Sequence, residues 1–264
     1  MLADLADLAD TAGLADPVDV VDQGGWAELV AGGPGALAAR LGAHLALRVP
    51  GFWPAERCAA YARRVYAGRP FWTADFEGDQ FSLGRAFYTH LEQGKRDDYF
   101  AQAVASNAHV ERLLPGLGAS LIEAVGAMVG APASQRPGWC GPGVHIFPAG
   151  GWLAQQGGDI HYDTEGLDAD HAARGEPAIT LVLMLQPPEQ GGELKVWNAR
   201  YAGSGEVDEA TLARPSALVP YAAGDLVVID SYRLHQIQPF EGTRDRVSAT
   251  AHGVRVADGW HVWF

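Results

Sequence analysis

Cysteine is scarce in this chain of 264 residues, which contains only Cys58 and Cys140. The two lie far apart and form no Cys-x-x-Cys pair, so the sequence excludes a zinc ribbon and a disulfide-stapled scaffold. Reduced thiols are the ordinary state of cysteine in the cytoplasm. We therefore expect a cytoplasmic protein with two free thiols.

Positive charge is also sparse, because 19 Lys and Arg stand against 32 Asp and Glu and give a formal net charge of −13. Nucleic-acid binding depends on clustered Lys and Arg that neutralise phosphates. We expect no nucleic-acid partner, and we interpret the acidic balance as a contribution to solubility.

Long hydrophobic runs are missing as well. No run approaches the ~20 apolar residues that cross a bilayer. The first ten residues, MLADLADLAD, lack the basic start and the apolar centre of a signal peptide. We expect no membrane partner, and the sequence leaves the oligomeric state open.

The first half of the chain is predicted to be mainly helical. Residues 1–45, rich in Ala, Leu, Gly and Asp, are interpreted as a loosely packed helical extension of a domain formed by residues 46–264. After a short strand and turn at 47–52, residues 53–65 are predicted as a helix. Apolar residues at helical spacing predict a further helix over 107–129, interrupted near Pro115 and Gly116. Residues 70–100 show no clear period and are assigned to loops and short pieces.

From about Gly141 the pattern changes to short β-favouring runs separated by Gly, Pro, Asn and Asp. The predicted strands are 144–147, 152–156, 160–162, 179–185, 194–197, 217–219, 226–229, 236–240, 247–252 and 261–264. Many short strands in close succession are typical of a jelly roll or barrel, and the preceding helices can pack on its outside. The sequence predicts one mostly β domain with flanking helices.

His161 and Asp163 are the first candidates for a metal site. On an extended segment, side chains two residues apart point the same way, so an imidazole and a carboxylate could reach one ion. His235, farther along, would complete the set of two histidines and one carboxylate that holds non-haem Fe(II) on one side. His-x-Asp alone is a weak motif, and its context decides its weight.

Three downstream segments supply that context. Gln190-Gly191-Gly192-Glu193-Leu194 is predicted as a tight turn between strands, and residues 223–230 lead as a turn and a buried strand toward His235. Arg246 and Ser248 share one face of the next strand. A guanidinium with a hydroxyl beside it can bind the distal carboxylate of a dicarboxylate.

Together these residues resemble the Fe(II)/2-oxoglutarate-dependent dioxygenase superfamily, nearest its prolyl 4-hydroxylase-like branch, most strongly from about residue 158 to 252. The resemblance implies a double-stranded β-helix (jelly roll) core in which His161, Asp163 and His235 hold Fe(II). It implies that Arg246 binds 2-oxoglutarate beside Ser248. Arg244 shares the parity of Arg246 and stays an alternative, which a bulge in the strand would decide.

The same resemblance implies the reaction. An unactivated carbon of a small molecule, an amino acid or a natural-product intermediate, is hydroxylated at the expense of O2 and 2-oxoglutarate, with release of succinate and CO2. Related halogenases have a small residue in place of the carboxylate, so Asp163 favours an oxidation without halide. Desaturation and cyclisation use the same centre and are not distinguished by the sequence.

The substrate contacts are hypotheses from position. Glu165 and Arg200 are candidates for the amine and carboxylate of an amino-acid-like substrate, and Trp152 and Trp197 flank the metal ligands, although aromatic residues on strands are core more often than not. His252 shares the parity of Arg246 and is expected to line the pocket. A polar stretch at 168–171 is interpreted as a solvated loop.

Two other functions use parts of this pattern. A zinc-dependent hydrolase also binds its metal with two histidines and a carboxylate, but it has no evident use for Arg246 and Ser248. A non-catalytic jelly roll that binds a ligand would keep the strands without needing all three metal ligands.

Overall fold

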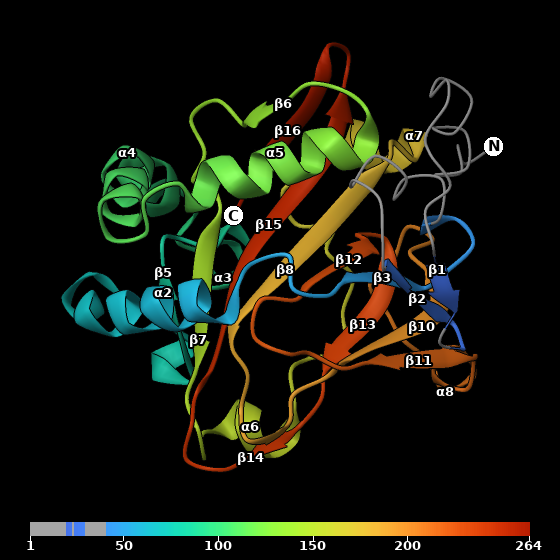
Figure 1. Cartoon of the computed structure of the whole chain (residues 1–264). Helices are drawn as coiled ribbons and strands as arrows, with labels where there is room; N and C mark the ends of the chain where they lie inside the picture. The colour runs from blue at the N-terminus through green and yellow to red at the C-terminus, as the bar shows by residue number, and fades with distance from the viewer. Residues whose placement is uncertain (1–19, 23, 30–40) are drawn as a thin grey trace.

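The computed structural model describes residues 20–22, 24–29 and 41–264. Within these ranges the strands form an eleven-stranded sheet, a three-stranded sheet and a two-stranded pair. The path through the large sheet is β1-β2-β3-β12-β8-β15-β7-β5-β4, with β16 beside β15 and β6 beside β16, and the small sheet has the order β11-β10-β13 (Figure 1). The arrangement is the predicted mostly β architecture, a double-stranded β-helix with flanking helices.

The central strands of the large sheet are β8 (Ala178–Gln186), β15 (Arg246–Val256), β7 (Gly143–Phe147) and β12 (Leu226–Asp230). The other strands are β1 (Val20–Asp22), β2 (Trp26–Leu29), β3 (Ala46–Val49), β4 (Thr73–Asp75), β5 (Gln80–Leu83), β6 (Ala133–Gln135), β9 (Gln190–Gly191), β10 (Leu194–Arg200), β11 (Ser216–Val219), β13 (Arg233–Ile237), β14 (Phe240–Glu241) and β16 (Gly259–Trp263).

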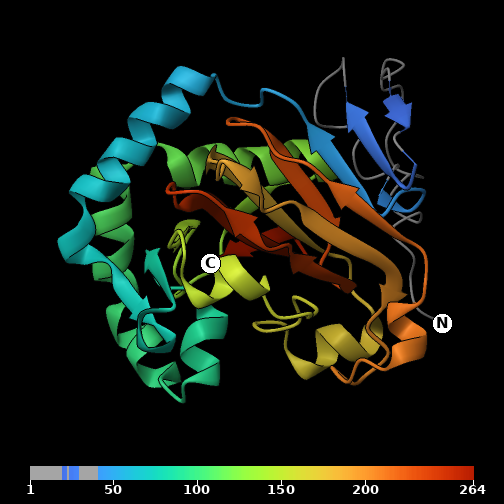
Figure 2. The same cartoon turned by 90° about the horizontal axis from the view of Figure 1, so that it is seen from below.

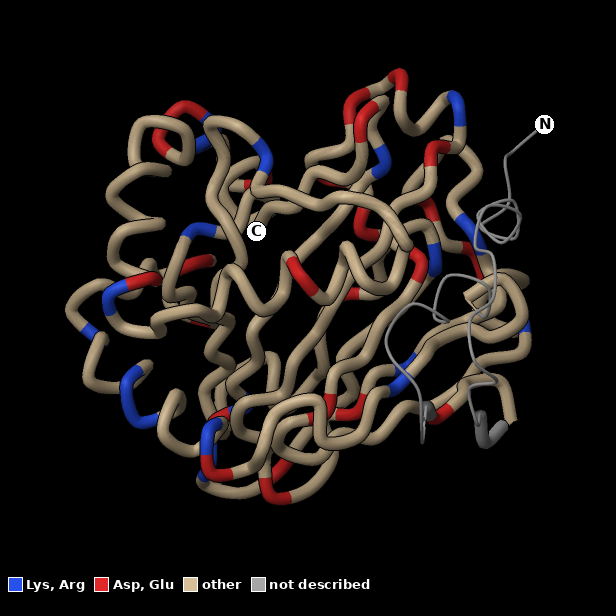
Figure 3. Tube along the Cα trace, turned by 45° about the horizontal axis from the view of Figure 1, so that its top comes forward, with Lys and Arg blue, Asp and Glu red and all other residues tan. Residues whose placement is uncertain are grey.

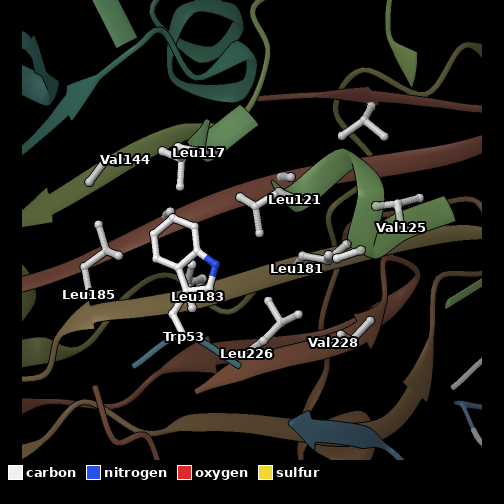
Figure 4. Close-up of a cluster of buried hydrophobic side chains, with 14 of the residues drawn as sticks. Trp53, Leu117, Leu121, Val125, Val144, Leu181, Leu183, Leu185, Leu226 and Val228 are labelled. Carbon is white, nitrogen blue, oxygen red and sulfur yellow. The ribbon is translucent and has the colours of Figure 1, made fainter. Parts of the chain in front are cut away.

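One face of the large sheet is apolar and packs against helices. Leu181, Leu183 and Leu185 of β8 belong to the main hydrophobic cluster, together with Leu121 of α5 (Leu117–Val129) and Val65 of α2 (Ala55–Ala67). Figure 4 shows the leucines of β8 and of α5 facing one another across this core. The alternation of the strands therefore places residues 180 and 182 on the opposite face.

That opposite face is turned toward the small sheet. Val227 and Ile229 of β12 pack there against Leu194 and Val196 of β10, and they close one side of the space between the sheets. Figure 2 shows the cyan and teal helices, α2, α3 (Phe87–Glu92) and α4 (Arg96–Leu113), beside the stacked strands. The two sheets thus enclose a space whose walls are set by strand alternation.

The predicted break near Pro115 is confirmed, because α4 ends at Leu113 and α5 begins at Leu117, with Gly116 at φ 79° between them. The prediction of loops and short pieces over 70–100 agrees with the short elements β4, β5 and α3, and it is wrong only at its end, where the long helix α4 begins at Arg96. The buried positions of α4 include the small Ala103 and the polar Ser106, which give only a weak apolar pattern in a sequence. Its helical period was therefore hidden.

Three other predictions differ from the structure. Residues 152–156 form the helix α6 instead of a strand, and 168–171 include the start of α7 (Ala169–Arg174), whose N-cap Asp168 accepts a hydrogen bond from the backbone of His171. In the predicted helical extension, 20–22 and 26–29 are strands, and β2 pairs with β3 of the main domain. The rest of that prediction, residues 1–19, 23 and 30–40, lies outside the described residues.

Charged residues of both signs are interspersed along the trace in Figure 3, where Lys and Arg positions lie among Asp and Glu positions.

Among the described residues, no single helix is long and apolar enough to cross a membrane. Only α4 and α5 taken as a pair reach that length and composition, and they are bent by 97° at the break between them.

Candidate active site

A cavity of about 350 Å³ lies on the face of the large sheet that is turned away from the helices. Thr180 and Val182 of β8 line it, as do Ser248 and His252 of β15 and His145 of β7. These residues alternate with the core residues described above, so the same period that builds the hydrophobic core also builds the cavity wall.

The three predicted metal ligands meet at this cavity. His161 Nε2 lies 3.4 Å from Asp163 Oδ1, and His235 Nε2 lies 3.3 Å from Asp163 Oδ2. One ligand atom from each residue fits within 4.8 Å of the others, the spacing that a single ion can bridge. His161 and His235 exchange both backbone hydrogen bonds, at 3.1 and 3.0 Å, which joins the extended segment of His161 to β13.

Both imidazoles are oriented for metal binding through Nε2. His161 Nδ1 lies 2.8 Å from the Asp159 carbonyl oxygen, and His235 Nδ1 lies 2.9 Å from the Arg233 carbonyl oxygen. A carbonyl oxygen only accepts, so each Nδ1 carries a proton, and Nε2 is the nitrogen left to bind a metal ion. Backbone partners of this kind fix the tautomer and ring orientation of histidine ligands.

The charges of the three groups are coupled. Burial opposes ionisation of Asp163, but the charges of His235, His252 and His161 hold its pKa well below the ordinary range. Burial also lowers the pKa of His161, yet the hydrogen bond and charge of Asp163 outweigh this effect and raise that pKa to about 9. Burial lowers the pKa of His235 to about 4. A carboxylate and a neutral imidazole are the forms that bind a divalent cation.

Arg246, rather than Arg244, faces the cavity. Arg246 is 1% exposed and donates to the Gly192 carbonyl oxygen at 3.2 Å and to Ser248 Oγ at 3.1 Å. Arg244 is exposed, precedes β15, and donates to the Pro188 carbonyl oxygen at 3.4 Å. The sequence predicted that the two arginines lie on the same face of one strand. This does not hold, because β15 begins at Arg246 and Arg244 precedes it.

The Gly191-Gly192 turn has a steric role beside Arg246. A Cβ on Gly191 would lie 2.3 Å from the Pro239 carbonyl oxygen, and a Cβ on Gly192 would lie 2.8 Å from a Pro188 ring carbon. Both glycines also have positive φ, of 75° and 76°. The segment predicted as a tight turn contains the two-residue strand β9, which pairs with β14, and it brings the Gly192 carbonyl to the guanidinium.

The side chains in the cavity fit the Fe(II) and the 2-oxoglutarate that the sequence predicts. Two imidazole nitrogens and a carboxylate converge in the cavity, and a buried guanidinium with an adjacent hydroxyl lies in the same cavity. A model of the 2OG-Fe(II) oxygenase superfamily matches residues 152–252, which include all five of these residues. The residues of the candidate site therefore match this superfamily. Its members use Fe(II), 2-oxoglutarate and O2.

Solved structures share the fold of this chain. An N-substituted L-amino acid dioxygenase from Burkholderia ambifaria AMMD is 13% identical, with a TM-score of 0.56 over 88% of this chain and 91% of that one. The epimerase SnoN, in complex with Fe3+, alpha-ketoglutarate and nogalamycin RO, is 15% identical, with a TM-score of 0.52 over 84% of this chain and 86% of that one. No curated protein sequence matches the chain. The prolyl 4-hydroxylase-like branch stays a prediction, because the matching model describes the superfamily as a whole.

The predicted substrate residues divide into two groups. Trp152, 51% exposed, and half-buried Glu165 line the cavity. Trp197 and Arg200 do not: the Trp197 indole packs in another cluster and donates to the Leu212 carbonyl oxygen, and Arg200 Nη1 lies 2.5 Å from Asp230 Oδ2. Arg200 therefore compensates a buried carboxylate and lies outside the cavity lining.

Sequence reasoning missed one wall of the cavity. Gln80 of β5, Tyr88 and Glu92 of α3, and the neighbouring Asp79 line it, and the Gln80 amide donates to the Tyr88 hydroxyl at 2.7 Å. Burial raises the pKa of Glu92 and also that of Glu165. These residues lie in the stretch without periodicity, so only the docking of α3 against the sheet brings them to the site. His252, in contrast, lines the cavity as predicted.

Proposed function

We propose that this oxygenase hydroxylates an unactivated carbon of a small molecule and releases succinate and CO2. One observation carries the proposal: the cluster of His161, Asp163 and His235 shares a single cavity with the buried pair of Arg246 and Ser248. A zinc hydrolase would need the first set but has no evident use for the second. A binding protein without turnover would need neither set in full.

The chain's residues have separate tasks in this reaction. Bound Fe(II) supplies the oxidising chemistry together with O2 and 2-oxoglutarate. His161 and His235 would hold it through their Nε2 atoms and Asp163 through a carboxylate oxygen. Arg246 pairs with the distal carboxylate of 2-oxoglutarate, and the burial of that guanidinium strengthens a charge-assisted bond. Apolar side chains such as Val182 and Ile229 line the cavity and exclude water.

The size of the cavity supports a small-molecule substrate, since about 350 Å³ is near the lower end of ligand pockets. The two solved relatives are named for N-substituted L-amino acids and for nogalamycin, which are small molecules. A cytoplasmic location belongs to the same proposal and is supported by the two free, buried cysteines.

The test is turnover of the cosubstrate. Protein incubated with Fe(II), ascorbate and carboxyl-labelled 2-oxoglutarate, with a panel of candidate substrates, is expected to release labelled CO2 and to give a product heavier by one oxygen. Asp163→Ala should abolish the release, and Asp170→Ala, on the exposed face of α7, should not. Absence of both cosubstrate binding and turnover in the wild type would refute the proposal. Product mass separates hydroxylation from desaturation.

A further inference from the structure

Four carboxylates line the outer part of the cavity. Asp79, Glu92 and Asp159 are exposed cavity-lining residues and Glu165 is half-buried, and we call these four the acidic rim. Glu92 and Glu165 are close enough for their charges to interact, and the charge of Asp159 acts on Glu92. A cleft lined with charge of one sign focuses the potential and raises the local concentration of ligands of opposite sign.

The acidic rim has no Lys or Arg ion-pair partner within the described part of the chain. None of the ion pairs of Lys or Arg in that part includes a rim carboxylate. Arg246 is the sole Lys or Arg among the described lining residues, and it lies at the buried end of the cavity. Arg200, which the sequence suggested for a substrate carboxylate, pairs with Asp230 instead. The outer cavity therefore offers no cation to a substrate anion.

The loaded centre does not offset the rim. Fe(II) brings two positive charges and 2-oxoglutarate brings two negative charges, while the charges of Asp163 and Arg246 cancel. The centre is therefore neutral overall when both are bound, and the charges of the acidic rim remain uncompensated.

A second observation, independent of the rim, is an incomplete hydrogen bond on one residue of the cavity wall. His145 is 5% exposed and lines the cavity, and its buried Nδ1 has no hydrogen-bond partner among the described residues. A buried polar atom without a partner is costly unless a ligand completes it. Burial lowers the pKa of His145 to about 3, so the imidazole is neutral and does not repel a cation.

We propose that the substrate is an organic cation, an amine protonated at neutral pH that carries no free carboxylate inside the cavity. The inference rests on the proposed function and names the substrate class of the same site. The ammonium group binds between Glu92 and Glu165 and near the exposed ring of Trp152, which can add a cation–π contact. Apolar lining residues such as Leu153 and Ile237 contact the carbon skeleton, and a polar group of the substrate bonds to His145.

Binding of matched probes tests the charge preference. Protein loaded anaerobically with Fe(II) and 2-oxoglutarate is titrated by calorimetry with benzylamine, benzyl alcohol and benzoate, which share a shape and differ in charge. Larger primary amines and their N-acetyl derivatives extend the panel. We expect the amines to bind about tenfold or more tightly than their neutral partners, and benzoate to bind most weakly, because the rim carboxylates attract a cation and repel an anion.

Paired variants show whether the rim causes the preference. Glu92→Gln with Glu165→Gln should reduce it to about threefold or less, since the amide keeps the shape and removes the charge. Glu56→Gln with Glu209→Gln removes the same charge from two exposed positions outside the cavity and should keep the preference. The control pair separates the rim from the overall charge of −13.

The outcomes distinguish this inference from the proposed function. If metal and 2-oxoglutarate bind but amines show no preference over neutral partners, or no amine binds, the cationic substrate is overturned and the oxygenase stands. Equal loss in both variant pairs also overturns it. Failure to bind metal and 2-oxoglutarate would instead contradict the proposed function.

Discussion

Thr180 Oγ1 donates a 2.6 Å hydrogen bond to Asp163 Oδ2, the oxygen that also faces His235. The same hydroxyl lies 2.9 Å from Ser231 Oγ and 3.1 Å from His252 Nδ1. A hydroxyl has one proton, so Ser231 and His252 must donate to Thr180. The network satisfies the hydroxyl completely, fixes the tautomer of His252 and holds the Asp163 carboxylate in one orientation.

Thr180→Val should therefore weaken metal binding, although all three metal-binding residues remain. Loss of a hydrogen bond that orients a metal ligand typically costs roughly 10- to 100-fold in metal affinity, and we expect a loss in this range when Mn(II) or Fe(II) is titrated under anaerobic conditions. Thr250→Val makes the same change on the same cavity wall, away from the Asp163 carboxylate, and should keep the affinity. Equal affinities for the two variants would contradict the role of Thr180.

Measurements of 2-oxoglutarate binding distinguish the roles of Arg246 and Arg244. Removing one partner of a buried, hydrogen-bonded charge pair costs roughly 2–5 kcal/mol, or about 30-fold or more in affinity. Arg246→Met should weaken 2-oxoglutarate binding to the metal-loaded protein by at least that factor, and Arg244→Met should leave it within about twofold because Arg244 lies outside the cavity. Isothermal titration measures both, and thermal unfolding verifies that each variant folds. A larger effect at Arg244 would reverse the assignment.

The parts of the site that the sequence predicted are those that local spacing controls. Arg246 and Ser248 lie two apart on one strand, so their shared face follows from the period of a strand. Arg200 was predicted as a substrate contact but lies outside the cavity lining, because its side chain pairs with Asp230, a partner that no local pattern reveals. Glu92 was missed because its place in the cavity depends on how α3 docks against the sheet. Strand alternation is local, whereas the docking of helices and the choice of ion-pair partners are tertiary.

Gly224 is expected to be indispensable for stability. It has φ 94°, a Cβ there would lie 2.0 Å from the Trp53 carbonyl oxygen, and its own carbonyl accepts from the Trp53 backbone at 3.0 Å. Gly224→Ala should lower the free energy of unfolding by about 2 kcal/mol or more, through backbone strain and overlap together. Gly203 has a similar φ of 99°, and no atom lies near a Cβ added there. Gly203→Ala therefore measures the effect of backbone strain without the overlap. Urea unfolding of both variants measures the difference, and equal losses would exclude a steric role at Gly224.

Cys58 should make the stability of the protein fall at alkaline pH. Burial is the main cause that raises the pKa of this thiol from 9.0 to about 11, with a smaller contribution from the charge of Asp225. Between these values the unfolded chain loses the thiol proton while the folded chain keeps it, so the folded state binds more protons. The contribution of Cys58 is therefore complete below pH 9 and is lost as the pH rises through 11.

Cys58→Ala provides the matched comparison for this effect, because it removes the thiol and leaves every other titrating group in place. The free energy of unfolding is measured in urea for both proteins at pH 8, 9, 10 and 11. We expect the wild type to lose stability relative to the variant as the pH rises above 9, and the difference between the two to be constant below it. A difference that does not change with pH would mean that the thiol titrates alike in the folded and unfolded chains, and that its burial does not oppose ionisation.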